Sequence, residues 1–384
     1  MRLLICAGGT GGGVYPALAV WEAINQEHDP KDLSVLWVGS VGGMEAELVT
    51  RMGLPYTEVP AAGVHGVGLK NLPHNLWQVL RGIFASRRIL KSFKPDVLFF
   101  TGGFVAVPMA LSARFTRTNK KKPASLVFIP DVEPGLALKT ITNFSVHIAL
   151  TVEDTKKYLN VKIPTAVCGY PVRSELMAWA KNESKKAEAY RFFDLSPELP
   201  TLLILGGSKG ARSINHAVLA SLPELLDICQ VIHITGQLDW EEVSAAKNKL
   251  VEKTSPEKAS RYIVFSYLHE ELAQAMAIAD MVVSRAGASV LGELPVFGIP
   301  AILVPYPYAW RYQVVNASYL VERQAALLIR DSELSQQLLT TVKQLFDNPQ
   351  RLNAMKTAMS NLAKPEAASA IARLLQLLAG GGDK

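Results

Sequence analysis

The sequence has no long hydrophobic run and few cysteines. No apolar stretch of the 384 residues reaches the roughly 18 residues that a helix needs to span a bilayer, which argues against an integral membrane protein. The first residues, MRLLICAGGTGGG, lack the pattern of a secretory signal peptide, so we expect a cytoplasmic protein. The three cysteines (Cys6, Cys168 and Cys229) show no metal-ligand spacing and lie in or next to apolar runs, which predicts buried thiols.

Two common nucleotide-binding signatures are also missing. Lys209 lies in a glycine-rich turn but lacks the spacing and the Lys-Ser/Thr pair of a Walker A motif. Gly39 and Ser40 follow the second apolar run, where a dinucleotide fold would place a ribose-binding acid. These absences argue against an ATPase and against a nicotinamide enzyme. The net charge of +6 allows a nucleotide or phospholipid partner, whereas no basic–aromatic motif indicates nucleic acid.

The order of the apolar patterns predicts two domains. Strand-length apolar runs alternate with helical stretches, which is typical of βαβ units and a parallel sheet covered on both faces. The pattern is interrupted near residues 167–173 and then repeats. We therefore predict an α/β protein with two Rossmann-like, doubly wound domains, residues 1–168 and 169–350, that face each other across a cleft. Residues 351–384 are expected to form helices that can pack back on the first domain.

Three glycine-rich turns, residues 8–13, 102–103 and 206–210, each follow a predicted strand. Ligands of doubly wound sheets bind at the carboxyl ends of the strands. Glycine lets the backbone approach a phosphate, and the free N–H groups of a following helix attract an anion. A tight connection explains any one turn, but three together favour a ligand in each half. The turn at 206–210, ahead of a helix predicted over 211–225, is our main candidate for a nucleotide diphosphate.

Residues 280–317 form a second informative stretch. A turn at residues 285–288 follows a predicted strand, and Glu293 lies about one helical turn further on. A carboxylate at that place can accept two hydrogen bonds from a ribose diol. Gln313 and Asn316 follow the next strand and can bond sugar hydroxyls. The alternative is that Glu293 and Asn316 are only surface or capping residues of their helices.

In combination, these motifs resemble the MurG family of peptidoglycan glycosyltransferases, in register over essentially the whole chain. They are GGTGG followed by PALAV, TGGFVAVPMALSA, GYPVR, GGSKGA followed by an Asn, and SRAGA followed by a Glu and a Pro-rich loop with a Gln. The resemblance implies a GT-B fold and no cofactor or metal ion. It implies inverting transfer of N-acetylglucosamine from UDP-N-acetylglucosamine to undecaprenyl-diphosphate-linked muramoyl-pentapeptide (lipid I), which gives lipid II.

The resemblance places the donor site in the second half. By position, Gly207, Ser208 and Arg173 would bind the diphosphate, and Glu293 would bind the ribose. Main chain at Leu268 and His269 would contact the uracil, and Ala288 and Gln313 would contact the sugar. Two positions depart from the family pattern, since Tyr312 replaces one of two paired glutamines and Lys209 replaces another glutamine.

The acceptor side departs further from the family. Gly13 stands where the family has a histidine that is the usual candidate for the general base, and FIPDVEPG stands where the family has HEQNxxxG. We predict Asp131 as the base, with Glu133 and His65 as alternatives; Asp131 can instead cap the following helix. Glycine at position 13 is expected to let the acceptor diphosphate come closer. The implied acceptor-binding residues are Thr10, Gly11, Gly12, Gly13, Gly102, Gly103 and Phe104.

The predicted helix at residues 76–93 mixes apolar and basic side chains. An apolar face rimmed by basic residues suits an anionic membrane, so we expect a peripheral protein on the cytoplasmic side of the plasma membrane; a core-facing helix with solvated charges is the alternative. The residues concerned are Trp77, Leu80, Ile83, Phe84 and Leu90 with Arg81, Arg87, Arg88, Lys91 and Lys94, and a second basic cluster at Arg114, Arg117 and residues 120–122.

Two other functions fit the changes on the acceptor side. One is a related transferase that uses a UDP-hexose and another lipid acceptor, such as diacylglycerol. The other is a non-catalytic homologue that binds a sugar nucleotide, because the usual histidine is Gly13.

Overall fold

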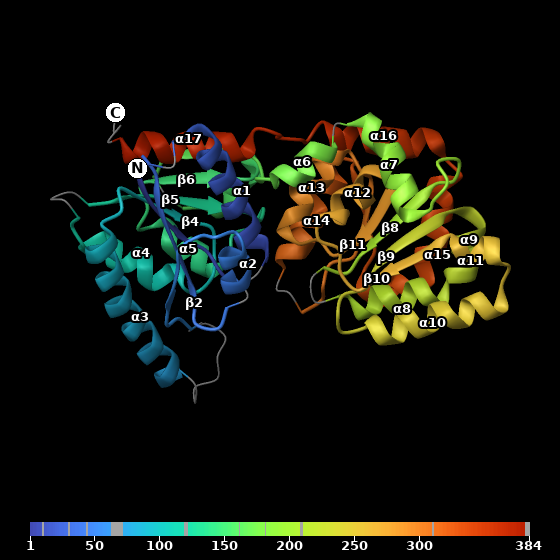
Figure 1. The fold of residues 1–384 in the computed structure, drawn as a ribbon, viewed down its shortest axis with the longest axis horizontal. Coiled ribbons are helices and arrows are strands. Elements are labelled where there is room, and N and C mark those ends of the chain that lie inside the picture. The colour runs from blue at the N-terminus through green and yellow to red at the C-terminus, as the bar shows by residue number, and fades with distance from the viewer. Residues whose placement is uncertain are drawn as a thin grey trace. The chain divides into compact units, whose positions relative to one another are not determined.

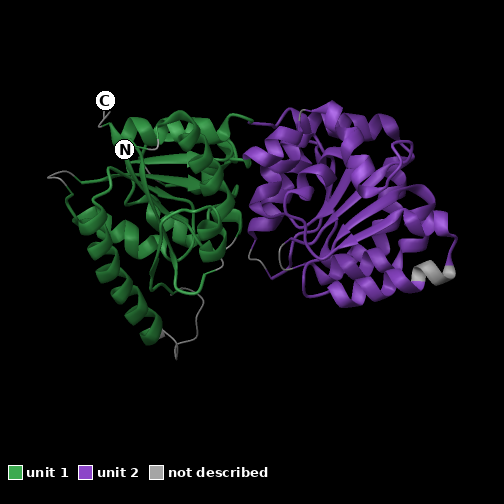
Figure 2. Ribbon diagram, viewed as in Figure 1, with its two compact units in different colours: residues 1–173, 365–384 green, residues 174–364 purple. Residues whose placement is uncertain are grey.

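The chain forms two compact units, residues 1–173 with 365–384 and residues 174–364 (Figure 2). The computed structural model describes residues 1–9, 11–29, 31–43, 45–62, 72–118, 122–160, 162–180, 182–207, 210–308 and 311–380. Each unit has its own sheet and its own buried apolar cluster. Among the described helices, none combines the length and the apolar character that a membrane crossing requires.

Unit 1 (residues 1–173 with 365–384) is built on a parallel sheet. Its strands are β1 (Arg2–Cys6), β2 (Ser34–Ser40), β3 (Tyr56–Val59), β4 (Val97–Phe100), β5 (Ala124–Ile129), β6 (His147–Leu150) and β7 (Thr165–Val167). They lie in the order β3-β2-β1-β4-β5-β6-β7 (Figure 1). Strand order reverses between β1 and β4, so the glycine turns that follow these two strands meet at one edge, where doubly wound sheets bind ligands.

Helices cover the sheet of unit 1. They are α1 (Gly11–Glu27), α2 (Glu45–Arg51), α3 (Leu72–Phe93), α4 (Ala106–Phe115), α5 (Leu136–Thr142), a 3₁₀ turn (Glu153–Tyr158) and α17 (Ala367–Ala379). α3 packs along α4, and α17 packs on α1, β4 and β5 (Figure 1).

The first helix contains a proline. Proline favours the first turn of a helix, but α1 runs from Gly11 and contains Pro16 in its second turn. A proline there has no N–H for the carbonyl of Gly12, so the helix loses one ladder bond. In the same turn, the hydroxyl of Thr101 donates to the carbonyl of Gly13 at 2.6 Å.

Unit 2 (residues 174–364) has a second parallel sheet. Its strands are β8 (Thr201–Leu205), β9 (Gln230–Ile234), β10 (Tyr262–Phe265), β11 (Met281–Ser284), β12 (Ala301–Leu303) and β13 (Ala326–Leu328). Their order is β10-β9-β8-β11-β12-β13 (Figure 1). The strands are buried and apolar along nearly their whole length, as expected for a sheet covered on both faces.

The helices of unit 2 alternate with these strands. They are α6 (Ser174–Ala180), α7 (Glu183–Phe193), α8 (Arg212–Ala220), α9 (Leu222–Ile228), α10 (Trp240–Lys253), α11 (Pro256–Ser260), α12 (Glu271–Ile278), α13 (Glu293–Phe297), α14 (Tyr312–Glu322), α15 (Leu334–Phe346) and α16 (Pro349–Ser360), with 3₁₀ turns at Ala288–Leu291 and Asp331–Glu333.

Two helical predictions differ from these boundaries. The helix predicted over 211–225 is interrupted at Ser221, because Pro223 lacks the N–H that would continue α8 into α9. Residues 351–384 do not act as one segment. α16 packs on α13 and α15 in unit 2, whereas α17 belongs to unit 1, and the chain changes unit after Arg173 and again at Pro365.

Candidate active site

The glycine turn after β8 has a backbone that only glycine accommodates. Gly207 and Gly210 have φ values of +78° and +81°, in the left-handed region that other residues avoid. A Cβ on Gly206 would lie 2.7 Å from the nitrogen of Ala211, and one on Gly210 would lie 2.5 Å from the carbonyl of Thr235. Nothing lies within 4 Å of a Cβ position on Gly207, so that face of the turn is open. Ser208 and Lys209 fall outside the described residues.

A buried polar network lies behind this turn. Asn215, on α8, donates to the carboxylate of Asp239 at 2.8 Å and to the carbonyl of Thr235 at 3.0 Å. Its amide oxygen lies 2.9 Å from Nε2 of His233, and Nδ1 of His233 lies 2.8 Å from the hydroxyl of Tyr262. The network ties the start of α8 to β9 and β10. The sequence pattern did not indicate this network, although the Asn of the glycine motif was visible.

The bonds of this network determine the tautomer of His233. Because both acceptors beside Asn215 take its N–H groups, the Asn215 oxygen faces His233, so Nε2 carries the ring proton and Nδ1 accepts from Tyr262. Complete burial lowers the pKa of His233 from 6.5 to about 3. The ring is therefore neutral at physiological pH.

Arg285, which was not among the predicted site residues, connects segments at the same edge of the sheet. Arg285, directly after β11, pairs with the carboxylate of Asp331 and donates to the Ser213 hydroxyl at 2.9 Å and the Val304 carbonyl at 3.1 Å. Ser213, in the first turn of α8, also donates to Asp331 at 2.7 Å. Arg285 thus joins α8 to the ends of β11 and β12.

The residues predicted for ribose and sugar lie on neighbouring segments of unit 2. Ala288 begins the 3₁₀ turn after β11, and Glu293 is the first residue of α13 and is half-buried. Gln313, at the start of α14, accepts the N–H of Tyr306 at 2.8 Å with its side-chain oxygen. Its amide NH₂ remains the group suited to a sugar hydroxyl.

Asn316 does not have the role that we predicted. Its side chain is fully buried and donates to the carbonyl of Ala286 at 3.1 Å. It therefore holds the turn after β11 in place and is neither a surface residue nor positioned to contact a sugar. The periodicity of α14 identifies its buried face, but not a partner 30 residues away.

The predicted uracil-binding segment follows β10. Leu268 is buried and His269 is exposed, with the His269 ring packed edge-on against Tyr267 at 4.8 Å. The N–H of His269 donates to the carboxylate of Glu271 at 3.1 Å. Since β8, β10, β11 and β12 are parallel, the segments that carry the predicted donor residues of unit 2 all leave the same edge of the sheet.

In unit 1, the two glycine turns pack directly on each other. A Cβ on Gly103 would lie 2.6 Å from the carbonyl oxygen of Gly8, and Gly103 has a φ of +83°. Gly102 is buried, whereas Phe104 is 57% exposed. Thr10 lies outside the described residues, and Gly11 and Gly12 form the first turn of α1, where backbone N–H groups have no partner within the helix.

The backbone around Gly13 does not match our expectation for that glycine. We expected its missing side chain to let a diphosphate approach. Gly13 is buried in α1, and a Cβ there would lie 3.2 Å from the carbonyl oxygen of Thr101. The space is taken by the end of β4, so glycine at this position lets α1 pack closely against Thr101.

The glycine turn after β1 is supported by a buried carboxylate that the sequence pattern did not indicate. Glu45, the first residue of α2, is fully buried and accepts the N–H groups of Ser40 at 2.7 Å and Gly9 at 3.2 Å. Trp37, in β2, also donates to the carbonyl of Ala7 at 3.0 Å. Burial and the nearby Glu45 carboxylate raise the pKa of Tyr56 well above its ordinary value.

The two described candidates for a base follow β5. Asp131 is half-buried, and its carbonyl accepts the hydroxyl of Thr155 at 3.5 Å. Glu133 is almost completely buried and lies 3.5 Å from Nζ of Lys139, which holds it as an ion pair. Asp131 is therefore the more exposed of the two carboxylates. His65 lies outside the described residues.

Arg173 lies at the end of unit 1. Its guanidinium stacks on the ring of Tyr15, in α1, with 4.6 Å between the guanidinium carbon and the ring centroid. The arginine predicted for the donor diphosphate is thus attached to the helix that follows the first glycine turn.

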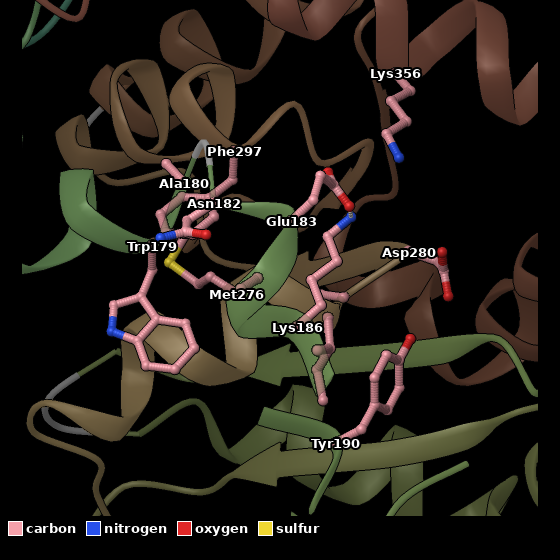
Figure 3. A pocket seen from close by; sticks show the side chains of 13 residues that line it. Trp179, Ala180, Asn182, Glu183, Lys186, Tyr190, Met276, Asp280, Phe297 and Lys356 are labelled. Atoms are coloured by element: carbon pink, nitrogen blue, oxygen red, sulfur yellow. Dashed lines mark ion pairs between the residues drawn. The ribbon is translucent and has the colours of Figure 1, made fainter. Parts of the chain in front are cut away.

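A polar pocket of about 80 Å³ lies at the opposite edge of the unit 2 sheet (Figure 3). Lys186 and Glu183 form an ion pair at 2.8 Å on its wall. Asp280, just before β11, accepts the N–H of Thr201, the first residue of β8, at 2.8 Å, and burial raises its pKa. The pocket therefore adjoins the amino ends of these strands and is separate from the candidate site.

Comparison with known families defines the class of the protein. The N-terminal domain of glycosyltransferase family 28 matches residues 3–119, and the C-terminal domain of the same family matches residues 201–374. Together they cover most of both units. The chain therefore belongs to glycosyltransferase family 28.

Individual relatives identify a more specific group of transferases within this family. The chain is 36% identical to a UDP-N-acetylglucosamine–N-acetylmuramyl-(pentapeptide) pyrophosphoryl-undecaprenol N-acetylglucosamine transferase from Roseiflexus sp. (strain RS-1), over 98% of this chain and 95% of the relative. It is also 36% identical to the enzyme of that name from Desulforudis audaxviator (strain MP104C), over the full length of both. It is a member of this transferase family, and the resemblance predicted from the motifs is confirmed.

Solved structures show the same fold. The crystal structure of MurG from Acinetobacter baumannii matches with a TM-score of 0.73 at 24% identity, over 98% of this chain and 99% of that one. A UDP-GlcNAc 2-epimerase from Neisseria meningitidis matches with a TM-score of 0.67 at 15% identity, over 98% of this chain and 100% of that one. The prediction of two Rossmann-like domains of the GT-B type is confirmed.

Proposed function

We propose that the chain transfers N-acetylglucosamine from UDP-N-acetylglucosamine to the muramoyl sugar of undecaprenyl-diphosphate-linked lipid I, which gives lipid II for peptidoglycan synthesis. A hydroxyl oxygen of the acceptor attacks the anomeric carbon of the donor and displaces UDP with inversion. The hydroxyl proton passes to a base, and the bonding electrons leave with the diphosphate of UDP. The names of the relatives support this reaction, and the glycine turn after β8 is the structural observation that carries it.

The turn after β8 is the proposed site of the departing diphosphate. Gly207 has an open face, and α8 begins at Arg212 with the positive end of its dipole toward the turn. N–H groups and a helix dipole that are already oriented stabilise the charge that develops on UDP. We assign the Ser208 hydroxyl and the Arg173 guanidinium as further donors to the diphosphate, the latter through a charge-assisted bond.

The remaining donor contacts follow the segments after β10, β11 and β12. We assign the ribose diol to the carboxylate of Glu293 and the uracil edge to main chain at Leu268 and His269. We assign the N-acetylglucosamine to Ala288 and to the amide NH₂ of Gln313. In support, the turn after β11 is held by the hydrogen bonds of Asn316 to the Ala286 carbonyl and of Arg285 to the Val304 carbonyl.

On the acceptor side, we propose that Asp131 takes the proton from the attacking hydroxyl. It is a half-buried carboxylate after β5, on the same sheet edge as the glycine turns after β1 and β4. The almost complete burial of Glu133 favours Asp131, which a substrate reaches more easily. His65 is a third candidate. Thr10, Gly11, Gly12, Gly13, Gly102, Gly103 and Phe104 are proposed to surround the acceptor.

We further propose that α3 and the end of α4 touch the cytoplasmic face of the plasma membrane. Trp77 and Phe84, on α3, are 59% and 66% exposed, and Phe115, at the end of α4, is 75% exposed. Exposed basic side chains flank them at Arg81, Arg87, Arg88, Lys91, Arg114 and Arg117. Large exposed apolar side chains beside cations suit a surface of anionic lipid, where an undecaprenyl acceptor resides.

Part of the predicted apolar face faces inward instead. Leu90 is completely buried in the core of unit 1, and Ile83 is half-buried, so the proposed membrane face consists of the exposed residues alone. In the predicted second basic cluster, residues 120 and 121 lie outside the described residues.

A transfer assay tests the reaction. Purified protein is incubated with labelled UDP-N-acetylglucosamine and a soluble lipid I analogue, and the disaccharide product and its anomeric configuration are determined. A β-linked product on the muramoyl sugar supports the proposal. Transfer to diacylglycerol in place of the lipid I analogue, or tight UDP binding without transfer to any acceptor, would overturn it.

A further inference from the structure

Glu45 occupies an unusual place for a carboxylate. Its side chain is fully buried beneath the turn after β1, and its two oxygens accept separate backbone N–H groups, one from Ser40 and one from Gly9. No basic side chain forms an ion pair with Glu45 in the parts of the chain that the structure describes. Buried polar groups have to be compensated by hydrogen bonds, and these two bonds supply that compensation for Glu45.

Glycines from separate segments make room for this side chain. A Cβ on Gly8, in the turn after β1, or on Gly43, just before α2, would overlap the carboxylate of Glu45. A Cβ on Gly39, near the end of β2, would lie 2.8 Å from the Cγ of Glu45. Gly8 is therefore required by Glu45, and not only by the approach of a ligand to the backbone.

The bond to Gly9 also decides which donors of the first turn face a ligand. Gly9 has a φ of +90°, and its N–H is directed to Glu45 beneath the turn. A ligand above the turn meets the N–H groups at the start of α1 instead. Because Gly103 packs on the carbonyl of Gly8, the position of the second turn depends on the first.

We propose that Glu45 is a positioning residue for the acceptor, which acts through the backbone of the first and second glycine turns. This inference rests on the proposed function for the identity of the acceptor, and on the geometry alone for the coupling of Glu45 to Gly8. Glu45 holds the turn so that the start of α1 and Phe104 present one fixed surface to the acceptor. It contacts neither substrate itself.

Kinetics on two matched variants test the proposal. Glu45→Gln keeps the size of the side chain but puts an NH₂ group against one of the two N–H donors. Glu47→Gln changes the same chemistry on the same helix at a side chain that is 79% exposed. We expect Glu45→Gln to raise the acceptor KM by about tenfold or more, with the donor KM unchanged and Glu47→Gln like wild type.

A merely structural role for Glu45 would affect both substrates. Equal increases in donor and acceptor KM, or a loss of activity matched by loss of folded protein, would overturn the positioning role. Unchanged kinetics for both substrates would overturn it as well.

A double-mutant cycle tests the packing without any activity. Gly8→Ala is combined with Glu45→Ala, and the free energy of unfolding is measured for wild type, both single variants and the double variant. We expect Gly8→Ala to destabilise wild type strongly and the Glu45→Ala background little, because the obstructing carboxylate is then absent. Equal losses in both backgrounds would overturn the inference. If Gly8→Ala does not fold, Gly43→Ala replaces it in the same cycle.

The two experiments separate the two proposals. If wild type transfers no sugar, the proposed function fails, while the cycle still reports whether Glu45 and Gly8 are coupled. If transfer occurs and the cycle shows no coupling, only the role of Glu45 fails.

Discussion

Replacing His233 by glutamine should make the fold of unit 2 less sensitive to acid. His233 is completely buried between Asn215 and Tyr262, and burial lowers its pKa from 6.5 to about 3. Unfolded chains take up a proton on this histidine below pH 6.5, whereas the folded protein does so only near pH 3. The stability contributed by the neutral ring is therefore fully present above pH 6.5 and is lost as the pH falls toward 3.

These two pKa values set the size of the effect. One pH unit in this window changes the free energy of unfolding by up to about 1.4 kcal/mol for one proton. Between pH 7 and pH 5, the difference in proton uptake corresponds to about 2 kcal/mol. The wild-type protein should lose this amount in addition to any loss that it shares with His233→Gln.

Urea unfolding at pH 7 and pH 5 measures this difference. The transition of unit 2 is identified as the one that UDP shifts to higher urea, because a ligand stabilises the part that binds it. Tyr262→Phe is the control, since it removes the hydroxyl beside Nδ1 but leaves the ring buried. It should lower stability by about 1–3 kcal/mol at both pH values and keep the acid dependence of wild type.

Equal losses in the free energy of unfolding for wild type and His233→Gln between pH 7 and pH 5 would refute this prediction. That result would mean that His233 takes up its proton in the folded protein, which is incompatible with a buried ring between Asn215 and Tyr262. The network would then not be the rigid support of α8 that the distances indicate.

Three further predictions concern the proposed chemistry. Asp131→Asn should lower turnover about 100-fold or more and leave the dissociation constant of UDP-N-acetylglucosamine unchanged in calorimetry; near-normal turnover would remove Asp131 as the base. Glu293→Ala should weaken donor binding about tenfold through loss of the ribose bonds, and an unchanged dissociation constant would refute that assignment. Trp77→Ser with Phe84→Ser should reduce sedimentation with anionic vesicles, whereas Leu238→Ser, at a residue that is 75% exposed in unit 2, should not; equal binding by both proteins would contradict a membrane face on α3.

The strands and their layering were predictable because the strands of a covered parallel sheet are continuous apolar runs. The apolar residues 2–6 form β1, and the apolar residues 201–205 form β8. Helix ends were less predictable. Pro16 lies inside α1 and Pro223 marks a break, and the position of a proline alone does not distinguish these cases.

The parts of the site whose residues lie in one short segment were predictable. The glycine turn after β8 is visible in its own residues, and Gly207 and Gly210 of the motif have the positive φ values. Asn316, Arg285 and Glu45 were missed or misassigned because their partners are distant in the chain. Asn316 bonds Ala286, and Arg285 pairs with Asp331. The sequence shows that these side chains are polar, but it does not show that the fold buries them.

Two glycines have neighbours that the sequence did not indicate. Glycine at position 13 was interpreted as room for a phosphate, and at position 8 as part of a phosphate-binding turn. The structure places Thr101 against position 13 and Glu45 against position 8. A glycine shows that something lies close to the backbone, and only the fold shows whether that neighbour is a ligand, a carbonyl or a side chain.

The return of the chain to unit 1 has a consequence for the order of folding. α17 packs on α1, β4 and β5, and its buried face (Ala367, Ile371, Ala372 and Leu375) completes a unit that the chain left at Arg173. On a ribosome, every residue of unit 2 emerges before this helix does, so the second unit can finish folding first. Until then, the nascent first unit keeps an uncovered apolar strip, which is the kind of surface that chaperones hold during synthesis.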